Sequence, residues 1–300
     1  MVFDVVGIGA SCIDHICRLP EFPEAGGARS KIRLISESRA CGGQMATALA
    51  TCQSFGLRSK YVGAVGQDED GECICQELRG RGIDTSDIAR RANLPTATAT
   101  ILIDDSGDRL VLWHRNPAIS FDPAMLPQEA LSTARLVHVD DVDEPAAIEA
   151  ARIARRAGIP VTCDLDHVTA RTGEFLSLMS MPIFAEHVPQ QLTGETDPER
   201  ALRALRHRHA GLLVVTLGAD GAAALDGESF HHVPAFSVSA VDTTGAGDVF
   251  RGGLIYATLL GMAVGDSLRF ANAAAAVSCL ALGAMAGVPG LEAVKQMMIR

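Results

Sequence analysis

The chain has 300 residues, of which 48% are hydrophobic and 4% aromatic, and its 26 Lys and Arg against 36 Asp and Glu give a net charge of −10. A large buried core is therefore available. The acidic balance argues against nucleic acid or an anionic membrane surface as a partner, because both carry negative charge. The composition favours packed helices and buried parallel strands, and it predicts a cytoplasmic protein that acts on a small molecule.

The first ten residues, MVFDVVGIGA, have no basic segment before their apolar run, which predicts a first strand rather than a signal peptide. The most apolar late stretch, Ala271–Gly287, is shorter than a membrane span and predicts a core helix. The eight cysteines contain no CxxC pair and the nine histidines no HExxH pair. We therefore expect most of them to be structural.

Apolar runs of strand length alternate with helical patterns along the chain. Strands are predicted at Val2–Ala10, Ser59–Val65, Leu136–Asp140, Pro160–Asp164 and Leu212–Leu217. Helices are predicted at Gly43–Phe55, Asp70–Arg81, Pro145–Ala157, Pro198–His209, Gly247–Gly261, Val264–Leu282 and Leu291–Ile299. This alternation indicates an α/β fold, with right-handed crossovers and a parallel sheet covered by helices on both faces.

Two segments depart from that rhythm. Within residues 11–40, the alternation at Lys31–Ile35 is typical of a half-exposed strand. Separately, the last third of the chain is predicted to be strand-rich up to Ala240. Within residues 96–114, two apolar runs flank a polar turn and predict a hairpin. We expect these strands to form a small sheet that acts as a lid over the carboxyl ends of the main strands, with a homodimer covering its edges.

The segment from Ala240 to Asp248 reads AVDTTGAGD and precedes a helical pattern. Small residues at 245–247 let consecutive N–H groups point outward at a helix start, where the helix dipole also favours an anion. Asp248 could accept a proton from a hydroxyl while the amides of Gly245, Ala246 and Gly247 stabilise phosphoryl charge. The alternative is that Asp248 serves only the helix dipole.

With its DTTGAGD string, the chain resembles the ribokinase-like (PfkB) carbohydrate kinase family over essentially its whole length. The resemblance implies one domain over residues 1–300, with a three-layer α/β/α fold and a β-sheet lid. It also implies ATP-dependent phosphorylation of a hydroxymethyl group on a pentose, hexose or ketohexose derivative, with Mg²⁺ and, in some relatives, K⁺. Competing P-loop, dinucleotide-binding and protein-kinase motifs are absent.

The resemblance assigns further residues by their match to family motifs. The sugar-side matches are Asp14, Gly42, Gly43, Thr47 and Asp140, where Thr47 stands in place of the usual Asn. The nucleotide-side matches are Thr216, Gly218, Gly221, Asn272 and Gly283. A monovalent-cation loop is matched by Asp242 and Thr244. The alternatives are a turn aspartate at Asp14, a helix-start glycine pair and a solvated strand-end acid at Asp140.

One family motif is missing. Members commonly carry NxxE before Leu-Thr-Gly to organise magnesium, and here Ala185 and Val188 occupy the Asn and Glu positions. Glu186 is the nearest carboxylate that could take over, and Asp164 and Asp166 are further candidates, with solvent-facing acids as the alternative. This changed region looks like a branch that includes sulfofructose kinase, which would imply a ketohexose derivative.

Arg251 follows Asp248 by three residues on the same helix face. A surface ion pair is the favoured interpretation, and contact with an anionic group is the alternative. Two other functions stay open. One is a nucleoside kinase, and the other is a sugar- or nucleotide-sensing protein on the same fold that has lost catalysis, as the missing NxxE motif suggests.

Overall fold

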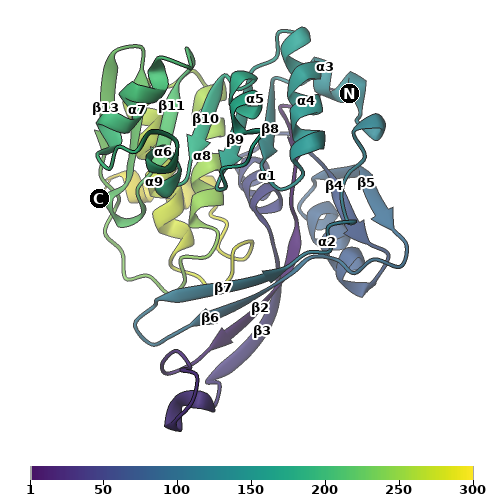
Figure 1. Cartoon of the computed structure of the whole chain (residues 1–300), viewed down its shortest axis with the longest axis vertical. Helices are drawn as coiled ribbons and strands as arrows, with labels where there is room; N and C mark the ends of the chain where they lie inside the picture. The colour runs from purple at the N-terminus through teal and green to yellow at the C-terminus, as the bar shows by residue number, and fades with distance from the viewer. Residues whose placement is uncertain (1, 300) are drawn as a thin grey trace.

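The computed structural model describes residues 2–299. Its main sheet has nine strands in the order β13-β12-β11-β10-β9-β8-β1-β4-β5 (Figure 1). The strands from β5 to β11 in this order are parallel, and β12 and β13 are antiparallel. Their bounds are β1 (Val5–Ile8), β4 (Ser59–Gly66), β5 (Asp84–Arg91), β8 (Leu136–Asp140), β9 (Val161–Leu165), β10 (Met181–Phe184), β11 (Leu213–Thr216), β12 (Ala222–Asp226) and β13 (Ser229–Val233).

Helices cover both faces of this sheet, as the βαβ alternation predicts. One face packs on α1 (Gln44–Ser54), α2 (Glu69–Gly80), α8 (Ala246–Leu259) and α9 (Val264–Ser278), with α10 (Leu291–Ile299) against α9. The other face packs on α3 (Gln128–Thr133), α4 (Glu144–Arg156), α5 (Thr172–Ser177), α6 (His187–Thr193) and α7 (Pro198–Arg206). The three-layer α/β/α prediction is therefore confirmed. No helix within residues 2–299 is long and apolar enough to cross a membrane.

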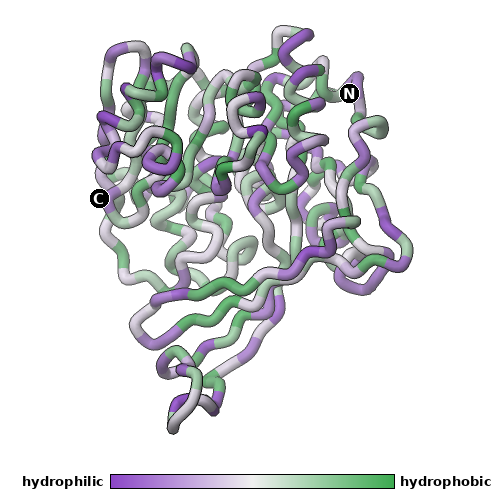
Figure 2. Tube along the Cα trace, in the orientation of Figure 1, coloured by the Kyte–Doolittle hydropathy of each residue, from purple (hydrophilic) through white to green (hydrophobic). Residues whose placement is uncertain are grey.

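The small sheet projects from the main body below the carboxyl ends of the parallel strands (Figure 1). It contains β3 (Ser36–Gly42), β2 (Cys12–Arg18), β6 (Thr98–Ile103) and β7 (Arg109–His114) in that order. Apolar residues run along these strands (Figure 2). Ile16, Ala99, Ile101 and Ile103 are buried against Leu282 of the main body, which fixes the inner face of the lid.

The lid joins the main body at the end of β3. There the Cys41 and Cys73 sulfurs lie 3.7 Å apart, and Arg39 pairs with Asp70 on the same helix, α2. Gly43 follows with φ of 100° and begins α1. A Cβ at this position would lie 2.5 Å from the Cα of Ser11, so the turn requires glycine for conformation and for space.

Several element predictions were wrong at their boundaries. The predicted strand at Lys31–Ile35 is exposed irregular chain, because the ladder with β2 starts at Ser36. The predicted core helix over Ala271–Gly287 ends at Ser278, and residues 236–240 form no strand. The strands β5 and β10 were missed, since β5 is polar and β10 is only 4 residues long. The strands β12 and β13 agree with the strand-rich region that is predicted up to Ala240.

Replacement of Gly43 by alanine is expected to lower the free energy of unfolding by at least about 2 kcal/mol, because it adds backbone strain and a clash. Gly56→Ala is the matched control, since Gly56 also has a positive φ, of 91°, but nothing lies within 4 Å of its would-be Cβ. Urea unfolding of both variants measures the difference. Equal losses would contradict the close approach at Gly43.

Candidate active site

The glycine-rich turn before α8 presents two free backbone donors. Gly245 has φ of 78° and caps the helix, and a Cβ there would lie 2.6 Å from the Cβ of Ala284. Within the described residues, the N–H groups of Gly245 and Gly247 have no hydrogen-bond partner, whereas Ala246 donates to the Thr243 carbonyl at 3.2 Å. The prediction of three outward amides is therefore corrected to two free amides in this conformation.

Asp248 lies in the first turn of α8, beside these amides. Its side chain is 15% exposed and accepts no hydrogen bond from the described part of the chain, and its nearest cation is the Arg251 Nη1 at 4.0 Å. Burial raises the pKa of Asp248 to about 7, with Arg251 opposing and Asp166 and Asp14 adding to the shift. An unpartnered carboxylate with a pKa near neutrality suits a general base.

The lid brings Asp14 next to the paired glycines, as their family motifs predict. Asp14 is buried, and a Cβ at Gly42 would lie 2.1 Å from its Oδ2. The Cys12 thiol donates to Asp14 Oδ1 at 3.2 Å. Burial raises the pKa of Asp14 to about 6. The missing side chain at Gly42 therefore leaves the space that this carboxylate occupies.

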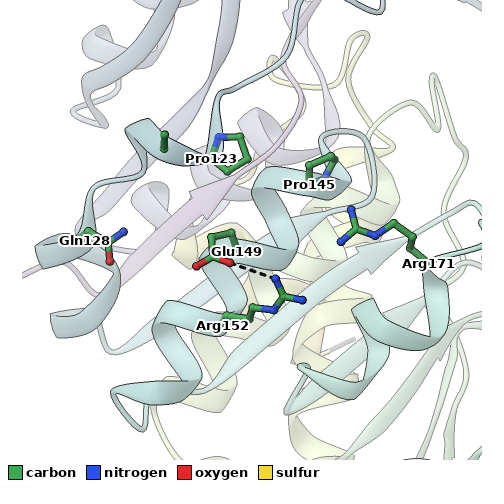
Figure 3. Close-up of a pocket in the computed structure, with 7 residues that line it drawn as sticks. Pro123, Gln128, Pro145, Glu149, Arg152 and Arg171 are labelled. Carbon is green, nitrogen blue, oxygen red and sulfur yellow. Dashed lines mark hydrogen bonds and ion pairs between the residues drawn. The ribbon is translucent and has the colours of Figure 1, made fainter.

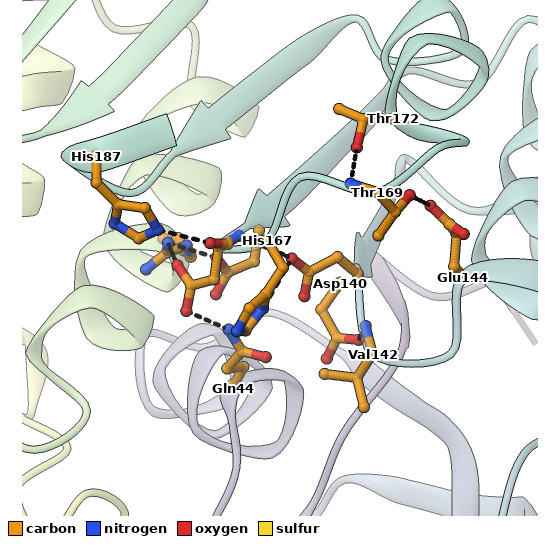
Figure 4. A network of polar contacts seen from close by, with 12 residues as sticks. Gln44, Asp140, Val142, Glu144, His167, Thr169, Thr172 and His187 are labelled. Atoms are coloured by element: carbon orange, nitrogen blue, oxygen red, sulfur yellow. Dashed lines mark hydrogen bonds and ion pairs between the residues drawn. The ribbon is translucent and has the colours of Figure 1, made fainter. Parts of the chain in front are cut away.

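The two other predicted sugar-side residues are enclosed. Thr47 lies under the turn, where its Cγ2 would be 3.4 Å from a Cβ at Gly245, and its hydroxyl is buried without a partner. Asp140 is fully buried and accepts a hydrogen bond from the Ala10 N–H at 2.7 Å. It also accepts one from the Val142 N–H at 3.1 Å (Figure 4). Asp140 therefore fastens the end of β1 rather than forming a solvated strand end.

The burial of Arg251 and Asp164 contradicts two interpretations, a surface ion pair at Arg251 and a solvent-facing acid at Asp164. Arg251 is not a surface residue, since its side chain is 4% exposed and is paired with Asp164, which is 1% exposed. It also lies 3.5 Å from Asp166 Oδ1. Asp164 is therefore buried and not solvent-facing, and this burial raises its pKa well above the ordinary value although Arg251 opposes the shift. Asp164 as a magnesium ligand stays a prediction. Asp166 is committed to Arg251 and to the Gln44 amide, which donates to its Oδ2 at 2.8 Å.

The predicted nucleotide residues fall into two groups. In the first, Thr216 and Gly218 form the turn after β11, and a Cβ at Gly221 would lie 2.2 Å from the Val233 carbonyl oxygen. The Asn272 amide donates to that same carbonyl at 2.9 Å, so Asn272 holds the end of β13. These contacts of Gly221 and Asn272 shape the edge of the site, and they do not offer free donors.

The second group ties the glycine-rich turn to the loop after α9. Asp242 Oδ2 accepts from the Gly283 N–H at 2.8 Å, and Oδ1 accepts from the Thr244 N–H at 2.8 Å. Both oxygens of the buried Asp242 therefore hold backbone. The Thr244 hydroxyl is buried without a partner. A monovalent cation at Asp242 and Thr244 stays a prediction.

Glu186 fits a magnesium ligand better than the β9 carboxylates do. Its Oε2 lies 4.0 Å from a Cβ built on Gly218, and its carboxylate is exposed and makes no hydrogen bond or ion pair with the described residues. It also lines a hollow of about 270 Å³ with Val215 and Leu217. Mg²⁺ needs few protein oxygens when phosphates and waters complete its shell, so one free carboxylate beside the nucleotide turn suffices.

A larger hollow, of about 470 Å³, lies between η2 (Pro123–Met125), α4 and α5, on the sheet face opposite α8 (Figure 3). Its arginines, Arg152 and Arg171, are both paired with Glu174. It contains none of the predicted site residues. The chemistry therefore belongs to the α8 face.

Sequence reasoning missed the contacts that assemble the site. Arg109 at the start of β7 donates to the Thr243 hydroxyl, so the lid touches the segment before the glycine-rich turn. Gln44 contacts Asp166 from the start of α1. The alternation of Thr162, Asp164 and Asp166 is the one signal that could have predicted a polar row under α8.

The family model described as pfkB family carbohydrate kinase matches residues 3–290, and the chain belongs to this family. It is therefore a phosphotransferase with the ribokinase-like fold. It is 27% identical to "Nucleoside kinase" of Methanothermobacter thermautotrophicus, covering 98% of this chain and 95% of that one. It is 29% identical to "Probable fructokinase-7" of Arabidopsis thaliana, covering 98% and 92%.

A solved structure agrees over the whole fold. A protein of Agrobacterium tumefaciens, provisionally described as a ribokinase, superposes with a TM-score of 0.92 at 27% identity, covering 100% of this chain and 98% of that one. The names of these three relatives, nucleoside kinase, fructokinase and ribokinase, refer to three different acceptors. The family is thus established, whereas the acceptor is not set by these relatives.

The pH dependence of kcat/KM is expected to show an acidic limb near pH 7, because the pKa of Asp248 is raised to about 7 and only its carboxylate accepts a proton. Activity should fall about tenfold per pH unit below this limb and level off above it. Saturating Mg²⁺ keeps the ATP phosphates ionised, so the limb reports the enzyme. A flat profile between pH 5 and 8 would contradict the raised pKa.

Proposed function

We propose that the protein transfers the γ-phosphoryl group of ATP to a hydroxymethyl group of a small sugar, a pentose, hexose or ketohexose derivative. The observation that carries the proposal is the Asp248 carboxylate, which has no hydrogen-bond partner among the described residues and lies beside the unpaired N–H groups of Gly245 and Gly247. A proton acceptor and an oxyanion-type donor pair thus share one helix start.

In this mechanism the acceptor hydroxyl gives its proton to Asp248 while its oxygen bonds to the γ-phosphorus. The bond between that phosphorus and the bridging oxygen of ADP breaks, and the amides of Gly245 and Gly247 donate to the transferred phosphoryl oxygens. Asp14 accepts a hydrogen bond from another sugar hydroxyl and orients the acceptor. The contact between Arg109 and Thr243 holds the lid over the site, which excludes water.

The nucleotide is proposed to bind along the turn of Thr216, Gly218 and Gly221, near Asn272 and Gly283. Mg²⁺ neutralises phosphate charge when it is bound, and Glu186 is the residue proposed to hold it. The free Glu186 carboxylate beside Gly218 supports this assignment. It also offers one answer to the missing NxxE motif.

A nucleoside acceptor is the second candidate, and Trp113 favours it. The lid register aligns Asp14 with Ala99 and Ala99 with Trp113, so these side chains share the inner face of the lid. Trp113 is 68% exposed and is the single tryptophan of the chain. An exposed indole in the row of Asp14 could stack on a base as well as on a sugar ring.

A homodimer through the lid is proposed from its other face. Leu110 and Leu112 on β7 are exposed, and β7 is an edge of the small sheet. Unpaired edges with apolar side chains favour a second copy. Light scattering at micromolar concentration is expected to give the dimer mass, and a monomer mass would reject this arrangement.

Substitution Asp248→Asn is expected to lower kcat about 10³-fold or more while leaving ATP and acceptor binding largely intact, because the amide cannot accept the proton. The measurement is ADP formation with MgATP over pentoses, hexoses, ketohexose derivatives including sulfofructose, and nucleosides. Asp266→Asn is the matched control, since Asp266 is an exposed first-turn aspartate of α9. Near-normal turnover in Asp248→Asn would remove the base assignment, and acceptor binding without turnover in the unmodified protein would favour a sensor.

Tryptophan fluorescence is expected to change on addition of the true acceptor, because Trp113 is the single tryptophan and lies in the row of Asp14. Saturable quenching by a nucleoside, together with a kcat/KM loss of about tenfold or more in Trp113→Leu, would identify a stacking contact with the base. No fluorescence change with an acceptor that is turned over would exclude Trp113 from the binding site. Met125→Ala, at an exposed apolar position of η2 outside the lid, is the control.

A further inference from the structure

The guanidinium of Arg251 lies behind the proposed base, at the junction of α8 and β9. We propose that Arg251 is a positioning residue, an internal cation that holds the Asp248 carboxylate in the geometry for phosphoryl transfer. The inference rests on the proposed role of Asp248. It adds a residue that the GAGD motif does not contain.

Arg251 is surrounded by three carboxylates. It pairs with Asp164, and its Nη2 lies 3.5 Å from Asp166 Oδ1 while its Nη1 lies 4.0 Å from Asp248 Oδ1. The Arg251 and Asp164 side chains are 4% and 1% exposed. The two terminal nitrogens of the guanidinium therefore face different groups. Nη2 faces Asp164 and Asp166, and Nη1 faces Asp248. Such a fork fixes orientation in a way that a single point charge does not.

The same guanidinium rests against the glycine-rich turn. A Cβ at Gly247 would lie 2.6 Å from Arg251 Nη1, so any side chain at this position would displace the arginine. Gly247 does not have a positive φ, unlike Gly245. Glycine at 247 therefore leaves the space that the Arg251 guanidinium occupies, and backbone conformation does not require it.

The far side of the cluster is anchored in the sheet. Asp166 accepts a hydrogen bond from Gln44 Nε2 at 2.8 Å, and its carbonyl oxygen lies 2.8 Å from His187 Nε2 (Figure 4). The end of β9 is thus connected to α1 and α6 as well as to α8. Arg251 links this framework to the first turn of α8, because it pairs with Asp164 and lies next to Asp248.

Two other roles fit the observations less well. A surface ion pair is excluded by burial of the side chain. Direct binding of a substrate anion would require guanidinium donors exposed to the open site, but the Arg251 side chain is only 4% exposed and its Nη2 is committed to Asp164 and Asp166. The arrangement instead resembles a support behind the reacting groups, which catalysis requires because small misplacements of a base cost turnover.

The test compares Arg251→Met and Arg251→Lys. Arg251→Met is expected to lower kcat about 10²-fold, with KM for acceptor and for MgATP within about threefold of the unmodified values, and Arg251→Lys should recover about tenfold. Arg156→Met, at an exposed position on α4, is the matched control. Loss of KM alone, or equal activity of the Lys and Met variants, would overturn the positioning role.

Arg251→Met also leaves the buried Asp164 unpaired, so the fold could weaken. The double variant Asp164→Asn/Arg251→Met removes this charge and is expected to regain the Tm of the unmodified protein without regaining kcat. Recovery of both would mean that Arg251 is only structural.

Introducing Arg251→Met into Asp248→Asn separates this inference from the base assignment. If Arg251 acts through Asp248, the second change should alter the residual turnover by less than about threefold. A full additive loss would show that Arg251 acts independently of Asp248 and would overturn the proposal. High activity of Asp248→Asn itself would instead remove the proposed base.

Discussion

The buried ion pair between Arg251 and Asp164 is the interaction on which the site depends. It joins the first turns of α8 to the carboxyl end of β9, where the main sheet stops. A buried pair of this kind contributes little net stability relative to apolar residues, but it strictly fixes which groups can be adjacent. Here the groups that it brings together are the candidate base, the free amides of the glycine-rich turn and the polar end of β9. These candidate site groups therefore lie together at one corner of the three-layer fold.

The lid supplies the other half of the site from a separate sheet. Its inner face presents Asp14 beside Gly42, and its far edge presents Trp113 and Arg109. Arg109 contacts Thr243, so lid closure and the glycine-rich turn are physically connected. Under the proposed function, acceptor choice depends on lid side chains, whereas phosphoryl transfer depends on α8. The relatives share one fold and are named for different acceptors, so the fold alone does not set the acceptor.

The parts of the fold that apolar periodicity and local motifs encode could be predicted from the sequence. The βαβ order, the hairpin at residues 96–114 and the helix after GAGD follow from apolar spacing and glycine placement. Burial of Arg251 could not be predicted, because its partners are 85 and 87 residues away in the chain. Ala246 was predicted as a free donor, but the turn closes onto Thr243. Asp140 was predicted either to contact the substrate or to be a solvated strand-end acid, and the fold excludes the solvated alternative by showing its backbone partners. Its contact with the substrate stays a prediction.

In the proposed mechanism, Asp248 takes the proton of the acceptor hydroxyl during phosphoryl transfer. Single-turnover rapid-quench measurement of labelled ATP, with enzyme and acceptor in excess, observes that step without product release. Asp248→Asn is expected to slow the transfer about 10³-fold or more although ATP and acceptor remain bound. Transfer at the unmodified rate would contradict the claim and move the search for the base to Asp14, the other carboxylate on the acceptor side.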